Sequence, residues 1–255
     1  MAMLGIERRN EILAMLENDG KVVVSQLSRE FGVAEETIRR DLEKLSQSGL
    51  AEKTHGGAIA VNKLKADLPY SVRNESNVRQ KQYIASLAAR MIGDGSFVML
   101  DSSSTAKYVL KALSSRKNIT VITNSVEILL ELSTKEDGWM VLSTGGTLKP
   151  GALSLIGSAA IRTIESFHVD YAVCSAKGID LRYGITDSNE NDALIKRAMF
   201  GCAQKRILAA DSSKFDKISF VRVFGHEHAS ALVTDKKPSD EWVEALKKSK
   251  TMLKY

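Results

Sequence analysis

Hydrophobic residues recur with helical spacing near the N-terminus of the chain. Ile38, Leu42 and Leu45 stand at i, i+4 and i+7, which predicts one buried stripe on a helix over about 35–48. An earlier segment, 5–17, carries apolar residues at amphipathic spacing and predicts a first helix. The N-terminal region is therefore expected to be mainly helical.

A short helix and a tight turn precede the helix predicted over 35–48. The short helix is expected over about 25–31, with Ser25 as its N-cap, and Gly32 marks the turn. Two helices joined in this way are typical of a helix-turn-helix, whose second helix enters the major groove of DNA. The sequence therefore predicts a DNA-binding first domain.

The segment after the second helix of this pair predicts a wing. Gly49 ends the helix, and residues 50–60 carry the pattern of a β-hairpin. Wings of this kind contact the minor groove or the backbone of DNA. Residues 1–60 are thus expected to form a winged helix-turn-helix.

The expected DNA contacts divide into base readers and backbone contacts. Glu36, Thr37 and Arg40 lie opposite the buried stripe and are expected to meet base edges. The residues expected to hold the DNA backbone are Ser25, Gln26, Arg39, Lys44, Lys53 and His55. An exposed helix face with i,i+4 ion pairs is the alternative interpretation of the charged residues on this helix.

The distribution of charge limits how DNA can be bound. The chain has a net charge of +5, but residues 1–62 hold eight basic and ten acidic residues, a net charge of −2. Any positive footprint must therefore be local, drawn from Arg39, Arg40, Lys44 and Lys53. A homo-oligomer, either a dimer or a tetramer, would multiply such a footprint.

The pattern changes after a polar segment, 61–76, which is interpreted as a linker. Apolar strands and amphipathic helices then alternate through residues 77–255, which predicts a mainly parallel, Rossmann-like α/β domain. The expected strands are 96–100, 119–123, 139–143, 171–175, 206–210 and 231–234. The expected helices are 78–92, 106–114, 125–133, 157–166, 191–203 and 239–250.

Small polar residues follow the expected strands. Open α/β sheets bind ligands beyond the carboxyl ends of their strands, and a helix that begins at Thr105 would present its N-terminal dipole to a phosphate. Asp101 is expected to accept hydrogen bonds from sugar hydroxyls, and Lys196 to supply a cation. The expected ligand-binding residues are Asp101, Ser102, Ser103, Ser104, Thr105, Thr123, Asn124, Gly145, Gly146, Gly178, Glu190 and Lys196. Turns and helix caps are the alternative explanation of such loops.

Other features narrow the class of protein. Cys174 and Cys202 stand in apolar settings and are expected to be buried free thiols of a reducing cytosol. No apolar run is long enough to span a membrane, and the first nine residues lack the apolar core of a signal peptide. We therefore expect a cytoplasmic protein with no membrane partner. His226-Glu227-His228 lacks an evident third ligand, so neither a metal nor a cofactor is expected.

The chain resembles the DeoR family of bacterial transcriptional regulators along almost its whole length. The resemblance is carried by Thr37-Ile38-Arg39-Arg40-Asp41-Leu42, Gly49-Leu50, His55-Gly56-Gly57-Ala58, Leu100-Asp101-Ser102, Thr123-Asn124-Ser125, Gly145-Gly146, Gly157, Lys196-Arg197-Ala198-Met199 and Asp211-Ser212-Ser213-Lys214. It implies a winged helix-turn-helix followed by a sensor domain similar to the sugar-phosphate isomerase fold. It also implies an oligomeric repressor of a carbohydrate catabolic operon, relieved by a phosphorylated sugar.

Two positions depart from the family pattern. Ala34 stands where the family usually has serine at the N-cap of the recognition helix, a loss expected to cost about 1 kcal/mol unless Glu35 or water compensates. Ser103 stands where the family usually has glycine in the phosphate loop, which is expected to constrain the turn.

Two functions from different classes remain at this point. The first is a sugar-phosphate-responsive regulator that binds double-stranded operator DNA and is not an enzyme, with activation as the alternative to repression. The second is a phosphosugar isomerase or deaminase fused to a DNA-binding domain. Its candidate acid–base groups are Asp101, Asp187, Glu190 and Lys196.

Overall fold

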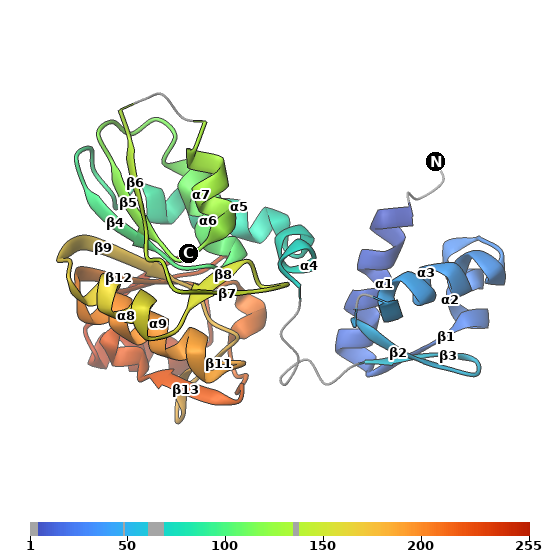
Figure 1. The fold of residues 1–255 in the computed structure, drawn as a ribbon. Coiled ribbons are helices and arrows are strands. Elements are labelled where there is room, and N and C mark those ends of the chain that lie inside the picture. The colour runs from blue at the N-terminus through green and yellow to red at the C-terminus, as the bar shows by residue number, and fades with distance from the viewer. Residues whose placement is uncertain (1–4, 48, 61–68, 135–137) are drawn as a thin grey trace. The chain divides into compact units, whose positions relative to one another are not determined.

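The computed structural model describes residues 5–47, 49–60, 69–134 and 138–255 (Figure 1). The chain divides into two compact units, Met1–Pro69 and Tyr70–Tyr255. Each unit has its own helices, and among the described residues the first unit has one sheet and the second has three.

The N-terminal unit is a winged helix-turn-helix. Its helices are α1 (Gly5–Asp19), α2 (Val24–Phe31) and α3 (Glu35–Gln47). Its strands, β1 (Lys21–Val23), β2 (Ala51–Thr54) and β3 (Gly57–Ala60), form an antiparallel sheet in the order β1-β3-β2 (Figure 1). Ile38, Leu42 and Leu45 are buried, as their spacing predicts. The predicted end of α3 at position 48 lies outside the described residues.

The turn between α2 and α3 is closed by local hydrogen bonds. Gly32 has φ 63°, and its N–H donates to the carbonyl of Ser28. The Ser28 hydroxyl donates to the carbonyl of Val33 at 2.6 Å. This left-handed conformation costs glycine little, so Gly32 suits the tight turn predicted at this position.

The expected N-cap at Ser25 is wrong. α2 begins at Val24, and its N-cap, Val23, makes no capping hydrogen bond through its side chain. The Val24 N–H instead donates to the carbonyl of Gly56 in the wing, at 2.9 Å. The hairpin thus satisfies a helix-end donor that a side chain would otherwise cap.

A seven-stranded parallel sheet forms the centre of the C-terminal unit (Figure 1). Its order is β15-β14-β12-β9-β4-β5-β6. The strands are β4 (Phe97–Leu100), β5 (Thr120–Thr123), β6 (Met140–Ser143), β9 (Val169–Cys174), β12 (Ala203–Ala209), β14 (Ala231–Val233) and β15 (Met252–Lys254). The first six match the expected strands to within a few residues. The mainly parallel α/β fold predicted for this region is confirmed.

Helices cover both faces of the sheet, so the strands are buried on both sides. One apolar cluster packs strand residues such as Val98 and Leu100 against α5 (Val78–Ala89), α6 (Ser104–Ala112) and α7 (Val126–Leu132). The other packs strand residues such as Met99 and Ile122 against the remaining long helices. These are α8 (Ser158–Glu165), α9 (Glu190–Gly201) and α10 (Asp240–Lys248).

The predicted linker, 61–76, extends too far. Residues 61–68 lie outside the described residues, but Tyr70–Glu75 forms helix α4 and belongs to the second unit. Tyr70 is buried, and its N–H donates to the carbonyl of Gly151 at 2.7 Å. The polar composition of this segment does not predict the short helix, because the helix is held by contacts with residues distant in sequence.

Several short elements were not predicted from the sequence. β7 (Thr147–Lys149) pairs with β8 (Ser154–Ile156) as an antiparallel hairpin. β10 (Gly178–Asp180), β11 (Gly184–Asp187) and β13 (Val221–Phe224) form a separate antiparallel sheet. Two 3₁₀ turns, Ser212–Lys214 and His226–His228, complete the unit.

Both cysteines are free thiols, but only Cys174 is buried, and Cys202 is partly exposed. Burial raises the pKa of both thiols, most strongly at Cys174. Among the described residues, none of the helices has the length and apolarity that a membrane crossing requires.

Candidate functional site

The outer face of α3 presents the predicted base-reading residues to solvent. Glu36, Arg40 and Lys44 are exposed, and Thr37 is partly buried. The Arg40 side chain is 77% exposed, and its Nε lies 3.4 Å from Glu36 Oε1. An exposed pair of this kind contributes about 0–1 kcal/mol, so DNA can replace Glu36 as the partner of Arg40 at little cost.

The residues predicted to contact the DNA backbone are also exposed. Arg39 is exposed and pairs with Glu35 at 2.9 Å, while Ser25 and Gln26 are exposed on the first turn of α2. His55 is exposed in the turn between β2 and β3. These four residues are therefore accessible to a DNA backbone.

Lys53 is tied to α3 by its ammonium group. It donates a hydrogen bond to the Glu43 carboxylate, and this contact holds the pKa of Glu43 below its ordinary value. The predicted phosphate contact of Lys53 thus requires an exchange of partners. Both side chains are about half exposed, so that exchange is cheap.

Asp41 lies on the buried side of α3, and the sequence did not distinguish it from the exposed charges nearby. Its carboxylate is 2.6 Å from Arg8 Nε and 3.2 Å from an Arg9 guanidinium nitrogen. Arg8 and Asp41 are both buried. Asp41 therefore joins α1 to the recognition helix, and an exposed-face interpretation of this residue is wrong.

The carboxyl edge of the parallel sheet contains a topological switch point. Strands β5 and β6 continue from β4 in one direction, whereas β9, β12, β14 and β15 continue in the other. In open α/β sheets a ligand crevice forms where the order reverses, here between the carboxyl ends of β4 and β9. The loop that begins at Asp101 lies at this position.

The loop after β4 leads directly into α6. The helix begins at Ser104, one residue before the expected start at Thr105, and Ser103 is its N-cap. The Ser103 hydroxyl accepts from the Ala106 N–H at 3.0 Å, so a side-chain cap occupies the position that is glycine in the family pattern. Ser102 and Ser103 are partly exposed, while Ser104 and Thr105 are buried.

Asp101 organises this loop from within. One carboxylate oxygen accepts from the Ser103 N–H at 3.0 Å, and the other accepts from the Ser175 N–H at 3.0 Å. The side chain is 1% exposed. The expected contact of Asp101 with a sugar hydroxyl is therefore not supported, because both oxygens face protein donors.

Lys196 also faces inward. Its ammonium donates to Asp187 and lies 3.6 Å from Asp101. Burial acts to lower the pKa of Lys196, but the carboxylates of Asp187 and Asp101 outweigh it and raise the pKa. Burial acts to raise the pKa of Asp187, and Lys196 outweighs it and lowers the pKa. Glu190 is exposed at the start of α9.

Several other expected ligand residues have structural roles. Thr123 is fully buried, and its hydroxyl donates to the carbonyl of Leu100 at 2.7 Å. Asn124 donates to the carbonyl of Leu155 at 3.1 Å, while its buried Oδ1 has no hydrogen-bond partner within the described chain. Thr123 thus links neighbouring strands, and Asn124 retains one acceptor at the carboxyl edge.

The three glycines expected to bind ligand differ in how closely other backbone atoms approach them. A Cβ on Gly146 would lie 2.5 Å from the Ile156 carbonyl oxygen, and one on Gly178 would lie 2.3 Å from the Lys217 carbonyl oxygen. Close backbone packing therefore explains both glycines. Gly145 is exposed with φ 62°, and a Cβ there would have no heavy atom within 4 Å.

Lys81 on α5 is a second buried cation, which the sequence analysis did not identify. Its ammonium donates to the carbonyls of Arg73 and Ser76. Burial lowers the pKa of Lys81 to about 8, opposed by Asp211 and aided by the charges of Lys214, Arg73 and Lys177. The charges that act on Lys81 are therefore mixed, one carboxylate and three cations.

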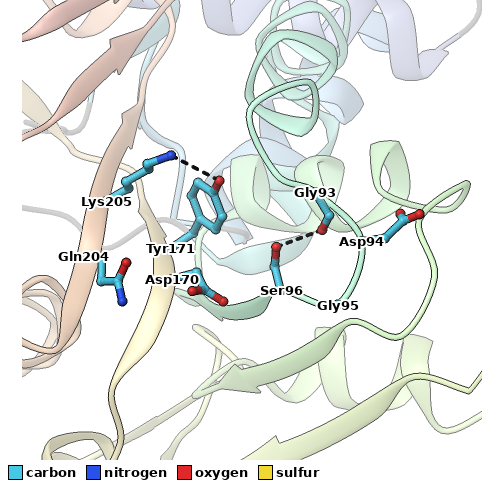
Figure 2. Close-up of a pocket in the computed structure, with 8 residues that line it drawn as sticks. All are labelled: Gly93, Asp94, Gly95, Ser96, Asp170, Tyr171, Gln204 and Lys205. Carbon is cyan, nitrogen blue, oxygen red and sulfur yellow. Dashed lines mark hydrogen bonds between the residues drawn. The ribbon is translucent and has the colours of Figure 1, made fainter.

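A separate cavity of about 280 Å³ lies at the opposite edge of the sheet (Figure 2). It is formed by the α5–β4 loop and the amino ends of β9 and β12. Its lining residues are Gly93, Asp94, Gly95, Ser96, Asp170, Tyr171, Gln204 and Lys205. None of them was among the expected ligand residues.

The histidines of His226-Glu227-His228 interact with the intervening glutamate. Glu227 Oε1 lies 3.2 Å from His228 Nδ1, and His226 packs edge-on against Trp242. Within the part of the chain that the structure describes, no group of three or more His, Cys, Asp or Glu residues could hold a metal ion.

A winged helix-turn-helix followed by a parallel α/β domain is the arrangement of a DNA-binding transcriptional regulator with a second domain. Residues 8–64 match the DeoR-like helix-turn-helix domain, and residues 76–236 match the DeoR C-terminal sensor domain. The chain belongs to the DeoR family of transcriptional regulators.

Similar proteins carry names of regulators. The chain is 40% identical to an uncharacterized HTH-type transcriptional regulator, YulB, of Bacillus subtilis, covering 97% of this chain and 95% of that protein. It is 35% identical to the transcriptional repressor AccR of Agrobacterium fabrum, covering 90% and 89%. It is 29% identical to the glycerol-3-phosphate regulon repressor of Escherichia coli, covering 91% of each.

Among solved structures, the chain is similar to ribose 5-phosphate isomerase A from Methanocaldococcus jannaschii. The TM-score is 0.41 at 16% identity, and the match covers 55% of each chain. A likeness at this level carries no argument about activity.

Proposed function

We propose that this protein is a repressor of a carbohydrate catabolic operon, and that a phosphorylated sugar releases it from operator DNA. The observation that carries the ligand proposal is the loop from Asp101 to Thr105, which enters a nine-residue helix at the switch point of the sheet. Backbone N–H groups and the helix dipole favour an anion at such a position. The names of two relatives, a transcriptional repressor and a glycerol-3-phosphate regulon repressor, support repression and a phosphorylated ligand.

We assign the base-reading role to Arg40, Thr37 and Glu36. Arg40 is the most exposed cation of the ion pairs on α3, and its partner Glu36 shares its face. A guanidinium suits the two acceptors that guanine presents in the major groove. Ser25, Gln26, Arg39, Lys44, Lys53 and His55 are assigned to the DNA backbone.

Release from DNA follows from a population shift. The phosphorylated sugar must bind the DNA-incompetent arrangement more tightly than the DNA-competent one. A homo-oligomer would couple two DNA-binding domains to the same ligand-dependent equilibrium. Among the expected ligand residues, Ser102, Ser104, Thr105, Asn124 and Gly145 retain the ligand role in this proposal.

The isomerase or deaminase alternative depends on Asp101, Asp187 and Lys196, which the structure brings together. The mutual pairing keeps Lys196 protonated and Asp187 ionised near neutral pH. An efficient general acid or base has a pKa near the working pH. Lys196 and Asp187 do not meet this condition, which supports a regulator over an enzyme.

The test combines two variants of the full-length protein with DNA from upstream of its own gene. Arg40→Ala is expected to weaken specific DNA binding, whereas Ser102→Ala/Thr105→Ala is expected to bind DNA normally and to resist release by a sugar phosphate. Arg222→Ala, which removes an exposed arginine of the second unit, is the control for both. Steady turnover of a sugar phosphate by the pure protein would instead support the enzyme.

A further inference from the structure

Two side chains from different helices converge on one carbonyl oxygen at the end of α4. The Lys81 ammonium, from α5, donates to the Arg73 carbonyl. The Ser104 hydroxyl, from the first turn of α6, donates to the same oxygen at 3.1 Å. The C-terminal end of α4 is therefore attached directly to the loop that we assign to phosphate.

The Lys81 ammonium is held by weak partners for a buried charge. It is 5% exposed and donates to the carbonyls of Arg73 and Ser76. In the described chain, no carboxylate is within ion-pair distance of it. Two carbonyl dipoles compensate a buried ammonium less well than an anion would. The lowered pKa of Lys81, about 8, agrees with this geometry.

Further contacts of α4 involve Tyr70, Arg73 and Asn74. Tyr70 is bonded to Gly151, and the Arg73 guanidinium lies over the Tyr70 ring at 5.3 Å from its centroid. The Tyr108 hydroxyl donates to the Asn74 carbonyl at 3.2 Å. A helix of six residues cannot stabilise itself in water, so it depends on these attachments.

We propose that ligand phosphate loosens α4 by taking the Lys81 ammonium and the Ser104 hydroxyl from the Arg73 carbonyl. This inference rests on the proposed function, because it assigns the phosphate group of the ligand to the loop before α6. The phosphate oxygens accept both donors, and the carbonyl at the end of α4 loses both. α4 is the first helix after residues 61–68 and the first element of the second unit. Its attachment therefore determines whether the second unit begins at α4 or at α5.

The coupling has a definite thermodynamic sign. The ligand-free state keeps the bonds to the neutral Arg73 carbonyl, and the ligand-bound state exchanges them for bonds to phosphate, a charged acceptor that binds both donors more strongly. Ligand binding and attachment of α4 therefore oppose each other. A variant that weakens the attachment mimics the ligand in part.

Hydrogen exchange of the full-length protein tests this coupling. The probes are inorganic phosphate and glycerol 3-phosphate, and the reference is a sodium chloride buffer that contains no sulfate. Backbone amides of 71–76 are expected to exchange about three- to tenfold faster when either probe is bound, the factor corresponding to loss of one or two hydrogen bonds. Amides of α8 are expected to be unchanged. Binding of the probe is measured in parallel by calorimetry.

Variants separate the attachment from general stability. Ser104→Ala and Lys81→Met are expected to speed exchange at 71–76 without any probe and to reduce the further response to it. Ser86→Ala is the matched control, because the Ser86 hydroxyl makes the same kind of bond, to the Tyr83 carbonyl at 2.7 Å. It is expected to behave as the unmodified protein.

The outcomes distinguish the coupling from the proposed function. A probe that binds while exchange at 71–76 is unchanged or slower refutes the release of α4 and leaves the regulator proposal standing. If neither probe binds, both the phosphate assignment and the release of α4 are refuted. Equal effects of Ser86→Ala and Ser104→Ala would also contradict the inference.

Discussion

Arg8 Nε lies 2.6 Å from Asp41 Oδ2, so a buried ion pair joins the first helix to the recognition helix. The two side chains are 9% and 5% exposed, and breaking a buried ion pair by removal of one charge is strongly destabilising. We expect Asp41→Ala to lower the free energy of unfolding of the N-terminal unit by about 3–5 kcal/mol. Hydrogen exchange of α1 and α3 in the full-length protein measures the loss.

The control for Asp41 is Glu35→Ala, which removes the partner of Arg39 on the solvent side of the same helix. That pair is about half exposed, so the expected change is below about 1 kcal/mol. Equal effects of the two substitutions would show that the Arg8–Asp41 pair does not stabilise the unit.

Arg40 and Arg39 are expected to differ in what they recognise on DNA. Arg40→Ala should weaken specific binding by about 1–3 kcal/mol and leave non-specific binding nearly unchanged. Arg39→Ala should weaken binding to all sequences and lower the salt dependence by about one unit of slope. Fluorescence anisotropy at several salt concentrations measures the affinity and its salt dependence for both variants. The opposite pattern would assign base reading to Arg39 and the phosphate contact to Arg40.

Adjacent glycines after β6 offer a matched test of the site geometry. Gly146→Ala places a Cβ 2.5 Å from the Ile156 carbonyl oxygen at φ 103°, whereas Gly145→Ala meets no heavy atom within 4 Å. We expect Gly146→Ala to cost more than the roughly 1 kcal/mol expected at Gly145 for positive φ alone. The urea midpoint of the second unit measures the difference. Similar midpoints would place the backbone farther apart than described.

Lys81 gives a pH dependence of stability with a defined sign. Its folded pKa of about 8 lies below its ordinary value of 10.5, so the unfolded chain binds more protons between these values. The contribution of Lys81 to stability therefore rises with pH from about 8 upward, at no more than about 1.4 kcal/mol per pH unit.

The measurement is the difference in unfolding free energy between the unmodified protein and Lys81→Met at pH 7.5, 8.5 and 9.5. Taking the difference removes the opposing effect of Cys174 and Cys202, whose raised pKa values make stability fall with rising pH. A difference that stays constant with pH would mean that Lys81 keeps its ordinary pKa.

The sequence predicted the elements whose patterns are long and regular. Apolar runs gave six strands of the parallel sheet, and the spacing of Ile38, Leu42 and Leu45 gave the recognition helix. β15 was missed because Met252, Leu253 and Lys254 form a short edge strand without a long apolar run. α4 was missed because its stability comes from contacts with residues far along the chain.

The candidate ligand site was predicted by position more successfully than by residue. Loops after strands indicate the carboxyl edge, but not which side chains turn inward. Asp101 and Lys196 pair within the protein. Lys81 lies on an amphipathic helix with no sequence signal of its own, and only the folded structure brings its ammonium to the Arg73 carbonyl. Residue type alone does not separate a buried ion pair such as Arg8–Asp41 from an exposed one.

The most direct test of the account is DNA binding by the purified protein, titrated with sugars and their phosphates in matched pairs. The DNA is the segment upstream of its own gene, and the pairs include glycerol with glycerol 3-phosphate and glucose with glucose 6-phosphate. The account predicts that at least one phosphorylated member releases the DNA while its unphosphorylated parent does not. Release by a parent sugar alone, or DNA binding that no phosphorylated member changes, would contradict it.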